Sequence, residues 1–300
     1  MLKKISKVVV FGALLVAAFS CSTNALAAET QTELSEKTAS KVDQLLEVYP
    51  GSADFMHMSI DMILSDDQMT ANQKNRSIQL SVDAVAKQEK LWAQEYQEKM
   101  DSYQRAQELH RNLVDSSPKD PEFDYNYYTN TWKNCADLVG GIGCEGTMNL
   151  MKYAVVPFKY VGTSWKPTIY RETNTYYATA AATSSELLSE AIFAKFQEEI
   201  LGEGLTSGTV SGVFSYEYPF ITGTGLDLAA GLHGVNWAVT FIQRNDGSYS
   251  ATYRITDVYD FANMGQDSFP DPLQVANNFG FSMQERGYIA PYNIELVYTM

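Results

Sequence analysis

A long run of apolar residues at helical spacing is the feature that most constrains this chain. The run follows Thr70, which forms a capping-box signature with Gln73. Its apolar residues recur at steps of three, four and seven positions, at Ile78, Val82, Val85, Trp92, Tyr96, Met100 and Tyr103. Lys, Glu and Gln occupy the opposite face. The pattern predicts an amphipathic helix of unusual length that packs in a bundle rather than standing alone.

Shorter helices are predicted on both sides of this long one. They cover Lys41–Val48, Ala53–Leu64, Met148–Val155 and a segment from about Thr183, capped by Glu186, to Ile200. The segment Asp115–Tyr128 contains Pro118, Pro121 and several tyrosines and aspartates. Because proline interrupts helices, this segment is predicted to be a loop.

The pattern changes near Gly202 to that of β-strands. Strands are predicted at Thr209–Tyr218, Val235–Ile242, Tyr249–Ile255 and Asn293–Tyr298, and a short helix follows Pro272. Asn245-Asp246-Gly247 lies between the second and third of these strands as a hairpin turn. Helices followed by strands predict an α+β fold. The predicted organisation is a signal sequence at 1–27, a mostly helical domain at 28–205 and a β-rich domain at 206–300.

Residues 1–27 have the three parts of a cleavable export signal. Lysines at positions 3, 4 and 7 precede an apolar run, Val8–Phe19, and Ala25-Leu26-Ala27 supplies an A-x-A cleavage site. The apolar run is shorter than the roughly 20 residues that a membrane-spanning helix needs. We therefore predict a secreted or periplasmic protein with no transmembrane span after cleavage. Lipid attachment at Cys21 is the alternative, although bulky Phe19 fits a lipoprotein signal poorly.

Charge and cysteine content bound the function further. Removal of residues 1–27 takes three of the 22 basic residues and none of the 36 acidic ones, which leaves a net charge of −17. A chain this acidic is a poor candidate for nucleic-acid binding, so no nucleic-acid partner is predicted.

Two cysteines remain after cleavage, Cys135 and Cys144. In an oxidising compartment they predict one disulfide, and two buried free thiols are the alternative.

The common catalytic motifs are absent from this sequence, which leaves one dense polar and aromatic run at 256–261. Asp257 and Tyr259 share one face of a strand there, whereas Asp260 points away unless the chain turns. Two carboxylates near a phenol are suited to hold a hard divalent cation or to orient a water molecule. The alternative is a strand end at which Asp caps backbone N–H groups, with Tyr259 and Phe261 in the core.

The region from about Ile221 to the C-terminus resembles the catalytic domain of colicin M, a bacteriocin that degrades the peptidoglycan precursor lipid II. The similarity covers roughly the last quarter of the chain. It consists of a hairpin with the turn Asn245–Tyr249, the Asp-x-Tyr-Asp-Phe run, a short helix and a closing strand at Tyr292–Leu296. The helical half shows no similarity to the other regions of that colicin.

This resemblance implies a toxin-like hydrolase that cleaves lipid II between the polyprenyl chain and the pyrophosphate, with Mg²⁺ as cofactor. It implies Asp257, Tyr259 and Asp260 as catalytic residues, with Asp257 and Asp260 as metal ligands and Asp260 as the key carboxylate. Lipid II or another lipid-linked envelope component is the implied partner, together with an immunity protein.

The sequence departs from the family at one pair of positions. Gln266 and Asp267 stand where the family has a His-Arg pair, which would supply proton transfer and a pyrophosphate contact. Arg254, Arg286 and His233 are the candidates to replace that pair. Two hypotheses follow: an exported lipid II hydrolase, or a catalytically inactive exported binding or scaffold protein that keeps the fold.

Overall fold

A computed structural model describes residues 34–114, 121–161, 169–171, 206–215, 227, 230–232, 234–261 and 272–299. The helices of these residues are α2 (Glu36–Val48), α3 (Ala53–Ser65), α4 (Ala71–Val114), α5 (Pro121–Gly141), α6 (Glu145–Tyr153) and α10 (Pro272–Glu285). The strands are β1 (Tyr170–Arg171), β2 (Ser207–Ser215), β3 (Gly234–Gln243), β4 (Tyr249–Tyr259) and β5 (Tyr292–Thr299). Short 3-10 turns lie at Pro50–Ser52 and Phe158–Tyr160.

The strands form one sheet in the order β1-β5-β4-β3-β2. Strands β2 to β5 pair antiparallel, and the short β1 pairs parallel with β5. β4 is central, with Trp237↔Ile255 on one side and Ile255↔Leu296 on the other. The predicted α+β class is therefore confirmed, with a mixed sheet at its centre.

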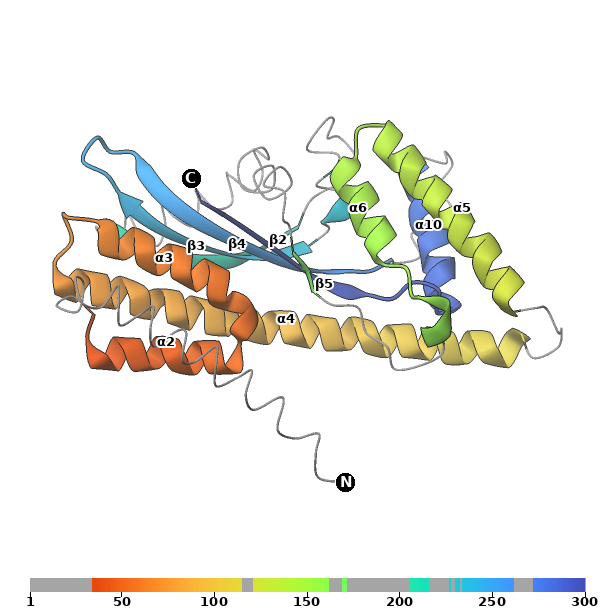
Figure 1. The fold of residues 1–300 in the computed structure, drawn as a ribbon, viewed down its shortest axis with the longest axis horizontal. Coiled ribbons are helices and arrows are strands. Elements are labelled where there is room, and N and C mark those ends of the chain that lie inside the picture. Colours follow the sequence, from red (N-terminus) through yellow and green to blue (C-terminus); the bar gives the residue numbers. More distant parts are fainter. Residues whose placement is uncertain are drawn as a thin grey trace, which may run out of the picture.

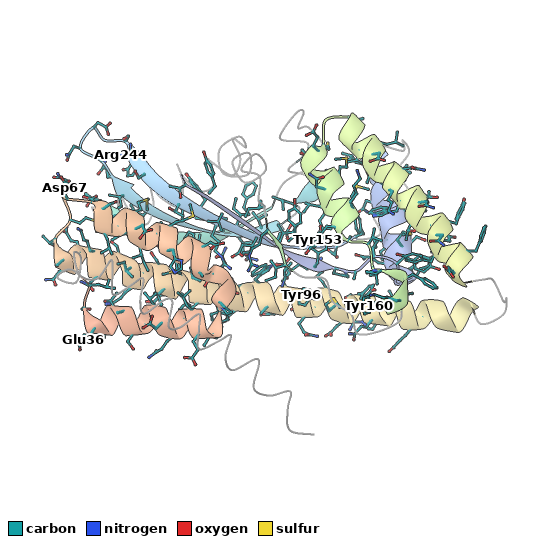
Figure 2. All side chains as sticks on the ribbon, viewed as in Figure 1. Glu36, Asp67, Tyr96, Tyr153, Tyr160 and Arg244 are labelled. Carbon is teal, nitrogen blue, oxygen red and sulfur yellow. The ribbon has the colours of Figure 1, made fainter. Side chains whose placement is uncertain are left out.

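Helices cover both faces of the sheet. In Figure 1, α4 runs along the length of the molecule, α2 and α3 lie beside its first half, and α5, α6 and α10 gather around its far end. Alternate residues of β3 serve the two sides: Ala238 and Ile242 join the core of α2, α3 and α4, whereas Trp237, Val239 and Phe241 join the core of α5, α6 and α10. The side chains that fill these layers are drawn in Figure 2.

The predicted long helix is α4, and its predicted start is confirmed. The Thr70 backbone N–H donates to Gln73 Oε1 at 2.9 Å and the Gln73 N–H donates to Thr70 Oγ1 at 3.3 Å, which is the reciprocal capping box. α4 packs against α2 and α3 and also lies directly on the sheet. Ser81 Oγ lies 2.6 Å from Thr209 Oγ1 on β2, a contact that only small polar side chains at this seam permit.

The local predictions that fall on described residues are confirmed with one exception. α2, α3, α6, α10, β2 to β5 and the hairpin turn lie where the pattern placed them, and Gly247 in that turn has φ of 81°. β1 was not predicted. The predicted loop over 115–128 is wrong from residue 121 on, because α5 begins at Pro121. Proline fits the first position of a helix, where its missing N–H has no intrahelical partner, and Glu122 and Asp124 favour the same turn.

The predicted disulfide is not formed, because Cys135 and Cys144 are both free thiols. α5 continues past Cys135 to Gly141, and the chain then returns only until the Cys144 N–H reaches the Val139 carbonyl at 3.2 Å. Cys144 is fully buried in the core of α5 and α6, whereas Cys135 on α5 is only half-buried at its edge. The alternative of two buried free thiols is confirmed for Cys144, whereas Cys135 is free but half-buried.

Several predicted features lie outside the described residues: the signal sequence 1–27 with Cys21, the helix at 183–200, His233, Gln266 and Asp267. The boundary predicted near residue 205 also lies outside them. The described elements on its two sides share hydrophobic cores, in which Trp132 and Leu150 pack with Val210 and Trp237. Within the described part of the chain, no helix is both long enough and apolar enough to span a membrane.

Candidate functional site

The candidate site is the end of β4, where the Asp257–Phe261 run leaves the sheet. Pairing between β3 and β4 ends at Asn236↔Thr256, so the following residues of β4 lie beyond their neighbour on that side. α4 contacts β4 at this point. Trp92 on α4 donates its indole N–H to the Asp257 carbonyl at 2.8 Å.

Asp257 is buried, with 4% of its surface exposed. Its carboxylate Oδ1 accepts the backbone N–H of Val258 at 2.8 Å. Burial raises the pKa of Asp257 well above its usual range, and the negative charges of Glu95 and Asp260 add to this effect. The side chain is therefore an internal strand cap whose charged form is disfavoured.

Tyr259 is also buried, on the side of the sheet that faces α5 and α6. Its ring contacts Phe261 edge-on at 5.0 Å between centroids and Tyr292 at 5.3 Å. Burial raises the pKa of its phenol far above the ordinary value, and the negative charge of Asp227 adds to this effect. Phe261 is held in turn by Gln284 of α10, which accepts its N–H at 2.9 Å and donates to its carbonyl at 2.8 Å.

Asp260 is the most accessible of the three predicted site residues, with 21% of its side chain exposed. Its carboxylate forms an ion pair with Lys99 of α4 at 3.0 Å. Burial opposes the charge on Lys99, but Asp260, Glu95 and Asp257 outweigh this cost and raise the pKa of Lys99. Glu95 accepts a hydrogen bond from Asn236 at 3.2 Å, and burial raises the pKa of Glu95 as well.

The structure thus brings Asp257 and Asp260 near two α4 residues, Glu95 and Lys99, and we call these four the strand-end cluster. The Lys99 ammonium group already occupies the place next to Asp260 that a cation would take. Among the described residues, no group of three or more His, Cys, Asp or Glu side chains is arranged to hold a metal ion. The magnesium site that the resemblance implies, with Asp257 and Asp260 as ligands, stays a prediction.

Arg254 was predicted only as a substitute for the missing His-Arg pair, and the structure gives it a different place. It is completely buried on the α4 face of β4 and forms ion pairs with Glu89 of α4 and Glu295 of β5. Its Nη1 donates to Gln88 Oε1 at 2.8 Å, and its guanidinium lies 5.5 Å from the Trp92 ring centre. Every side of this guanidinium is engaged inside the protein, so it cannot reach a substrate.

Arg286, the second substitute, is also engaged. Its guanidinium lies over the Tyr128 ring at 4.5 Å, and its Nη1 donates to the Ser282 carbonyl at 2.9 Å. These contacts hold it between α5 and the end of α10, rather than at the strand-end cluster. Lys99 is therefore the cation that lies beside Asp260. From the sequence, Lys99 could be assigned only to the polar face of a long helix.

Asp227 is a buried carboxylate that the sequence reasoning missed. It accepts the backbone N–H groups of Gly146 at 2.8 Å and Thr147 at 2.7 Å, and it also accepts the Thr147 hydroxyl at 2.7 Å. These N–H groups belong to the first turn of α6, whose N-cap position is Cys144, a side chain that makes no capping bond. Asp227 therefore caps α6 from a distant part of the chain.

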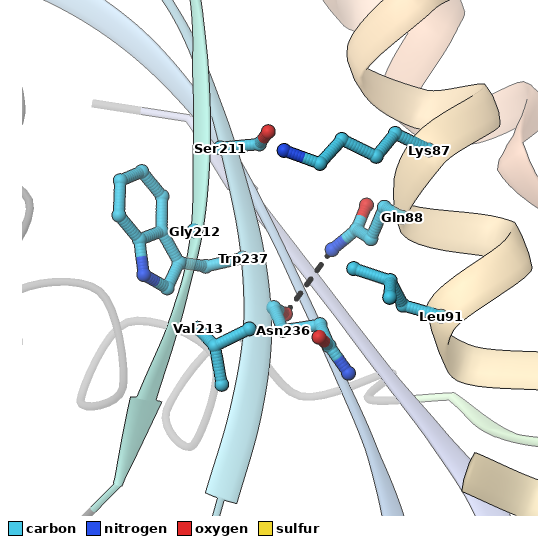
Figure 3. Close-up of a pocket in the computed structure, with 8 residues that line it drawn as sticks. All are labelled: Lys87, Gln88, Leu91, Ser211, Gly212, Val213, Asn236 and Trp237. Atoms are coloured by element: carbon cyan, nitrogen blue, oxygen red, sulfur yellow. Dashed lines mark hydrogen bonds between the residues drawn. The ribbon is translucent and has the colours of Figure 1, made fainter. Parts of the chain in front are cut away.

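A cavity of about 50 Å³ lies between α4 and β2, and its lining includes Asn236, which donates to Glu95 of the strand-end cluster. It is lined by Lys87, Gln88, Leu91, Ser211, Gly212, Val213, Asn236 and Trp237. Figure 3 shows Gln88 reaching across it to the Asn236 carbonyl, a hydrogen bond of 3.1 Å. Its volume suits a few water molecules rather than a substrate.

Replacement of Asp257 by asparagine should make folding stability less dependent on pH. Because burial raises the pKa of the folded Asp257, its stabilising contribution is present below about pH 3.9 and is lost as the pH rises through the raised pKa. The asparagine side chain would keep an acceptor for the Val258 N–H but has no charge to bury. As the pH rises across this window, we expect the free energy of unfolding of the variant to increase relative to that of the wild type by at most about 1.4 kcal/mol per pH unit.

Urea unfolding of the two proteins at a series of pH values measures that difference. The matched control is Asp246→Asn in the exposed hairpin turn, which changes the charge equally. Parallel stability curves for wild type and Asp257→Asn would mean that Asp257 ionises freely in the folded protein.

In comparisons with known proteins, no family model, no curated protein and no solved structure matches this chain. The resemblance to colicin M stays a prediction from the sequence.

Proposed function

We propose that this chain is an exported protein that uses its sheet and helices as a non-catalytic scaffold for binding. The observation that carries the proposal is the state of Asp257, a buried carboxylate that already serves the Val258 N–H at the end of β4. A metal ligand or general base must instead present its carboxylate to a substrate site. The basic and apolar segments of residues 1–27, followed by A-x-A, support export.

The other two residues of the run support the same proposal. Tyr259 contributes its ring to the core between Phe261 and Tyr292. The residue is 3% exposed, so its phenol is not presented to a substrate at the surface. Asp260 holds α4 to the end of β4 through Lys99, over a separation of 161 residues along the chain. Each side chain thus has a structural partner that accounts for its position.

A lipid II hydrolase is the second candidate, because one observation favours it. Lys99 has 38% of its side chain exposed beside Asp260, so a cation and a carboxylate meet at the surface next to the run. In this alternative Lys99 would contact the pyrophosphate in place of the family arginine, and Asp260 would act with Mg²⁺. Lipid II or another lipid-linked component, and an immunity protein for the producer, would then be the partners.

Magnesium binding separates the two candidates. We expect Asp260→Asn to leave Mg²⁺ binding unchanged, because in the scaffold the Asp260 carboxylate pairs with Lys99 and holds no metal. Isothermal titration of Mg²⁺ into the wild type, Asp260→Asn and the control Asp246→Asn measures this, since both variants remove one charge. Loss of a binding event in Asp260→Asn alone would support the hydrolase instead.

A further inference from the structure

Strand β2 forms one edge of the sheet, and its inner side pairs with β3. Among the residues that the structure describes, no strand pairs with its outer side. The Gln243 N–H donates to the Thr206 carbonyl at 2.7 Å, and bonded pairs recur at every second residue of an antiparallel ladder. Residues 208, 210 and 212 therefore bond β3, whereas residues 207, 209, 211 and 213 direct their N–H and carbonyl groups outward.

β2 lacks the features by which proteins usually block an exposed sheet edge. Its nine residues, SGTVSGVFS, include no charged side chain and no proline. Its pairing with β3 is continuous from Ser207↔Ile242 to Ser215↔Gly234, so no bulge interrupts it. β1, at the opposite edge of the sheet, has only two residues. The outer edge of β2 is thus the edge that is suited to accept a further strand.

The cavity between α4 and β2 lies beside this outer edge. Its lining includes Val213 and Leu91, which expose 66% and 40% of their surface. Lys87 is the one charged residue among the described residues that line it, and no described side chain forms an ion pair with it. Figure 3 shows the Lys87 ammonium group directed toward Ser211. A strand added beside Ser211 would therefore meet a cation next to two apolar side chains.

We propose that the outer edge of β2 binds an extended, otherwise uncharged segment of a partner protein that places one acidic side chain opposite Ser211. The inference rests on the proposed scaffold function and names the kind of partner that the scaffold binds. In this mode of recognition, main-chain hydrogen bonds supply affinity and alternate side chains supply specificity.

The direction of the β2 side chains explains the acidic position. Thr209 contacts Ser81 of α4, so Ser211 and Val213 face α4 as well, because side chains alternate along a strand. A residue directly opposite Ser211 in the added strand projects to the same face. Its carboxylate then lies beside Lys87, and apolar residues two positions away in either direction lie along the rim of the cavity.

A second copy of this chain fits the edge less well. Two β2 strands paired antiparallel about Ser211 would place serine opposite serine, so neither copy would offer a carboxylate to Lys87. The net charge of −14 on each copy also opposes their association. A single carboxylate in an uncharged segment meets Lys87 without this general repulsion.

Residue-resolved amide hydrogen exchange tests the edge in the exported protein. Without a partner, the amides of residues 209, 211 and 213 should exchange at least about tenfold faster than those of 208, 210 and 212, which bond β3. Slow exchange at the three outward amides would overturn the proposal, because the edge would already be paired. Protection that rises with protein concentration alone would also overturn it, since a second copy would then occupy the edge.

The probe for binding is the end-blocked heptapeptide TVTETVT, which has the same sequence in both directions. With its glutamate opposite Ser211, its two valines face α4. The peptide should slow exchange at residues 209, 211 and 213, and N-methylation of its glutamate should abolish binding because that N–H pairs with β2. A peptide that leaves these three amides unprotected at saturating concentration would contradict the proposal.

Charge exchange tests the contact with Lys87 by isothermal titration. Replacement of the peptide glutamate by lysine should weaken binding at least about fivefold, and Lys87→Glu should reverse that preference. Lys90→Glu, an exposed lysine of α4 outside the cavity lining, is the control and should preserve it. Equal binding of both peptides by the wild type would overturn the acidic assignment.

Two changes at Ser211 test the main-chain contact. Ser211→Pro removes an outward N–H and should abolish binding, whereas Ser211→Ala keeps that N–H and should bind as the wild type does. Urea unfolding establishes that each variant is folded, and Lys87→Glu keeps the test decisive if the proline variant is not. Undiminished binding by folded Ser211→Pro would contradict the proposal. Lipid II turnover tests the scaffold function separately, because it does not depend on β2.

Discussion

Replacement of Arg254 by methionine is expected to lower the free energy of unfolding by about 3–5 kcal/mol. The guanidinium is wholly buried between α4 and the sheet, where it is paired with Glu89 and Glu295. Without it, two carboxylates would remain buried with their main positive partner removed. Among the described residues, Glu295 would keep the ion pair with Arg171, which is 2.8 Å away and 43% exposed. The loss comes from these uncompensated charges rather than from the packing volume of the side chain.

Urea denaturation of wild type and Arg254→Met measures the loss. Arg244→Met, an exposed arginine of the hairpin turn, is the matched control and should change stability by less than about 0.5 kcal/mol. A variant in which Arg254, Glu89 and Glu295 all become apolar should recover much of the stability, because burying a charge network costs desolvation. A loss below about 1 kcal/mol for Arg254→Met would mean that water reaches this network in solution.

This network also explains why α4 lies on the sheet. Gln88 donates to the carbonyls of Asn236 on β3 and Arg254 on β4, at 3.1 and 3.3 Å, and accepts from the Arg254 guanidinium. One face of α4 thus supplies polar partners to two neighbouring strands. The buried contacts fix the position of α4 along the sheet, and they place Glu95 and Lys99 at the end of β4.

Local features of the fold could be predicted from the sequence because local interactions determine them. The start of α4 depends on Thr70 and Gln73, and the hairpin turn depends on Asp246, whose carboxylate accepts the Ser248 N–H at 2.9 Å. The apolar period of α4 was visible for the same reason. This period did not reveal which element α4 packs against, because an apolar stripe on a helix packs equally well on other helices or on a sheet. The predicted bundle therefore omitted the contact of α4 with β2, β3 and β4.

The candidate site was only partly predictable. Strand alternation placed Asp257 and Tyr259 on one face, and the alternative of a strand end with Tyr259 and Phe261 in the core agrees with their burial. The partners could not be inferred, because Lys99 lies 161 residues from Asp260 in sequence. The cap of α6 by Asp227 also joins residues that are far apart in sequence, 81 positions from Gly146 to Asp227. Such pairs depend on the tertiary fold and leave no pattern in a single sequence.

Lipid II turnover has the second large expected effect, because an active enzyme would accelerate hydrolysis by at least about a millionfold over the uncatalysed reaction. In the scaffold account Asp257 caps the strand, Tyr259 packs in the core and Asp260 pairs with Lys99. We therefore expect no release of the soluble pyrophosphoryl head group above the level of an Asp260→Ala variant. This should hold for Mg²⁺ and for other divalent metals.

The most direct test of the account is to incubate the folded exported protein, residues 28–300, with lipid II and Mg²⁺ beside Asp260→Ala, and to measure the released head group. Equal, background-level release from both proteins is the result that the scaffold account predicts. Release by the wild type that is lost in Asp260→Ala would contradict it, and would show that the strand-end cluster is catalytic without the His-Arg pair.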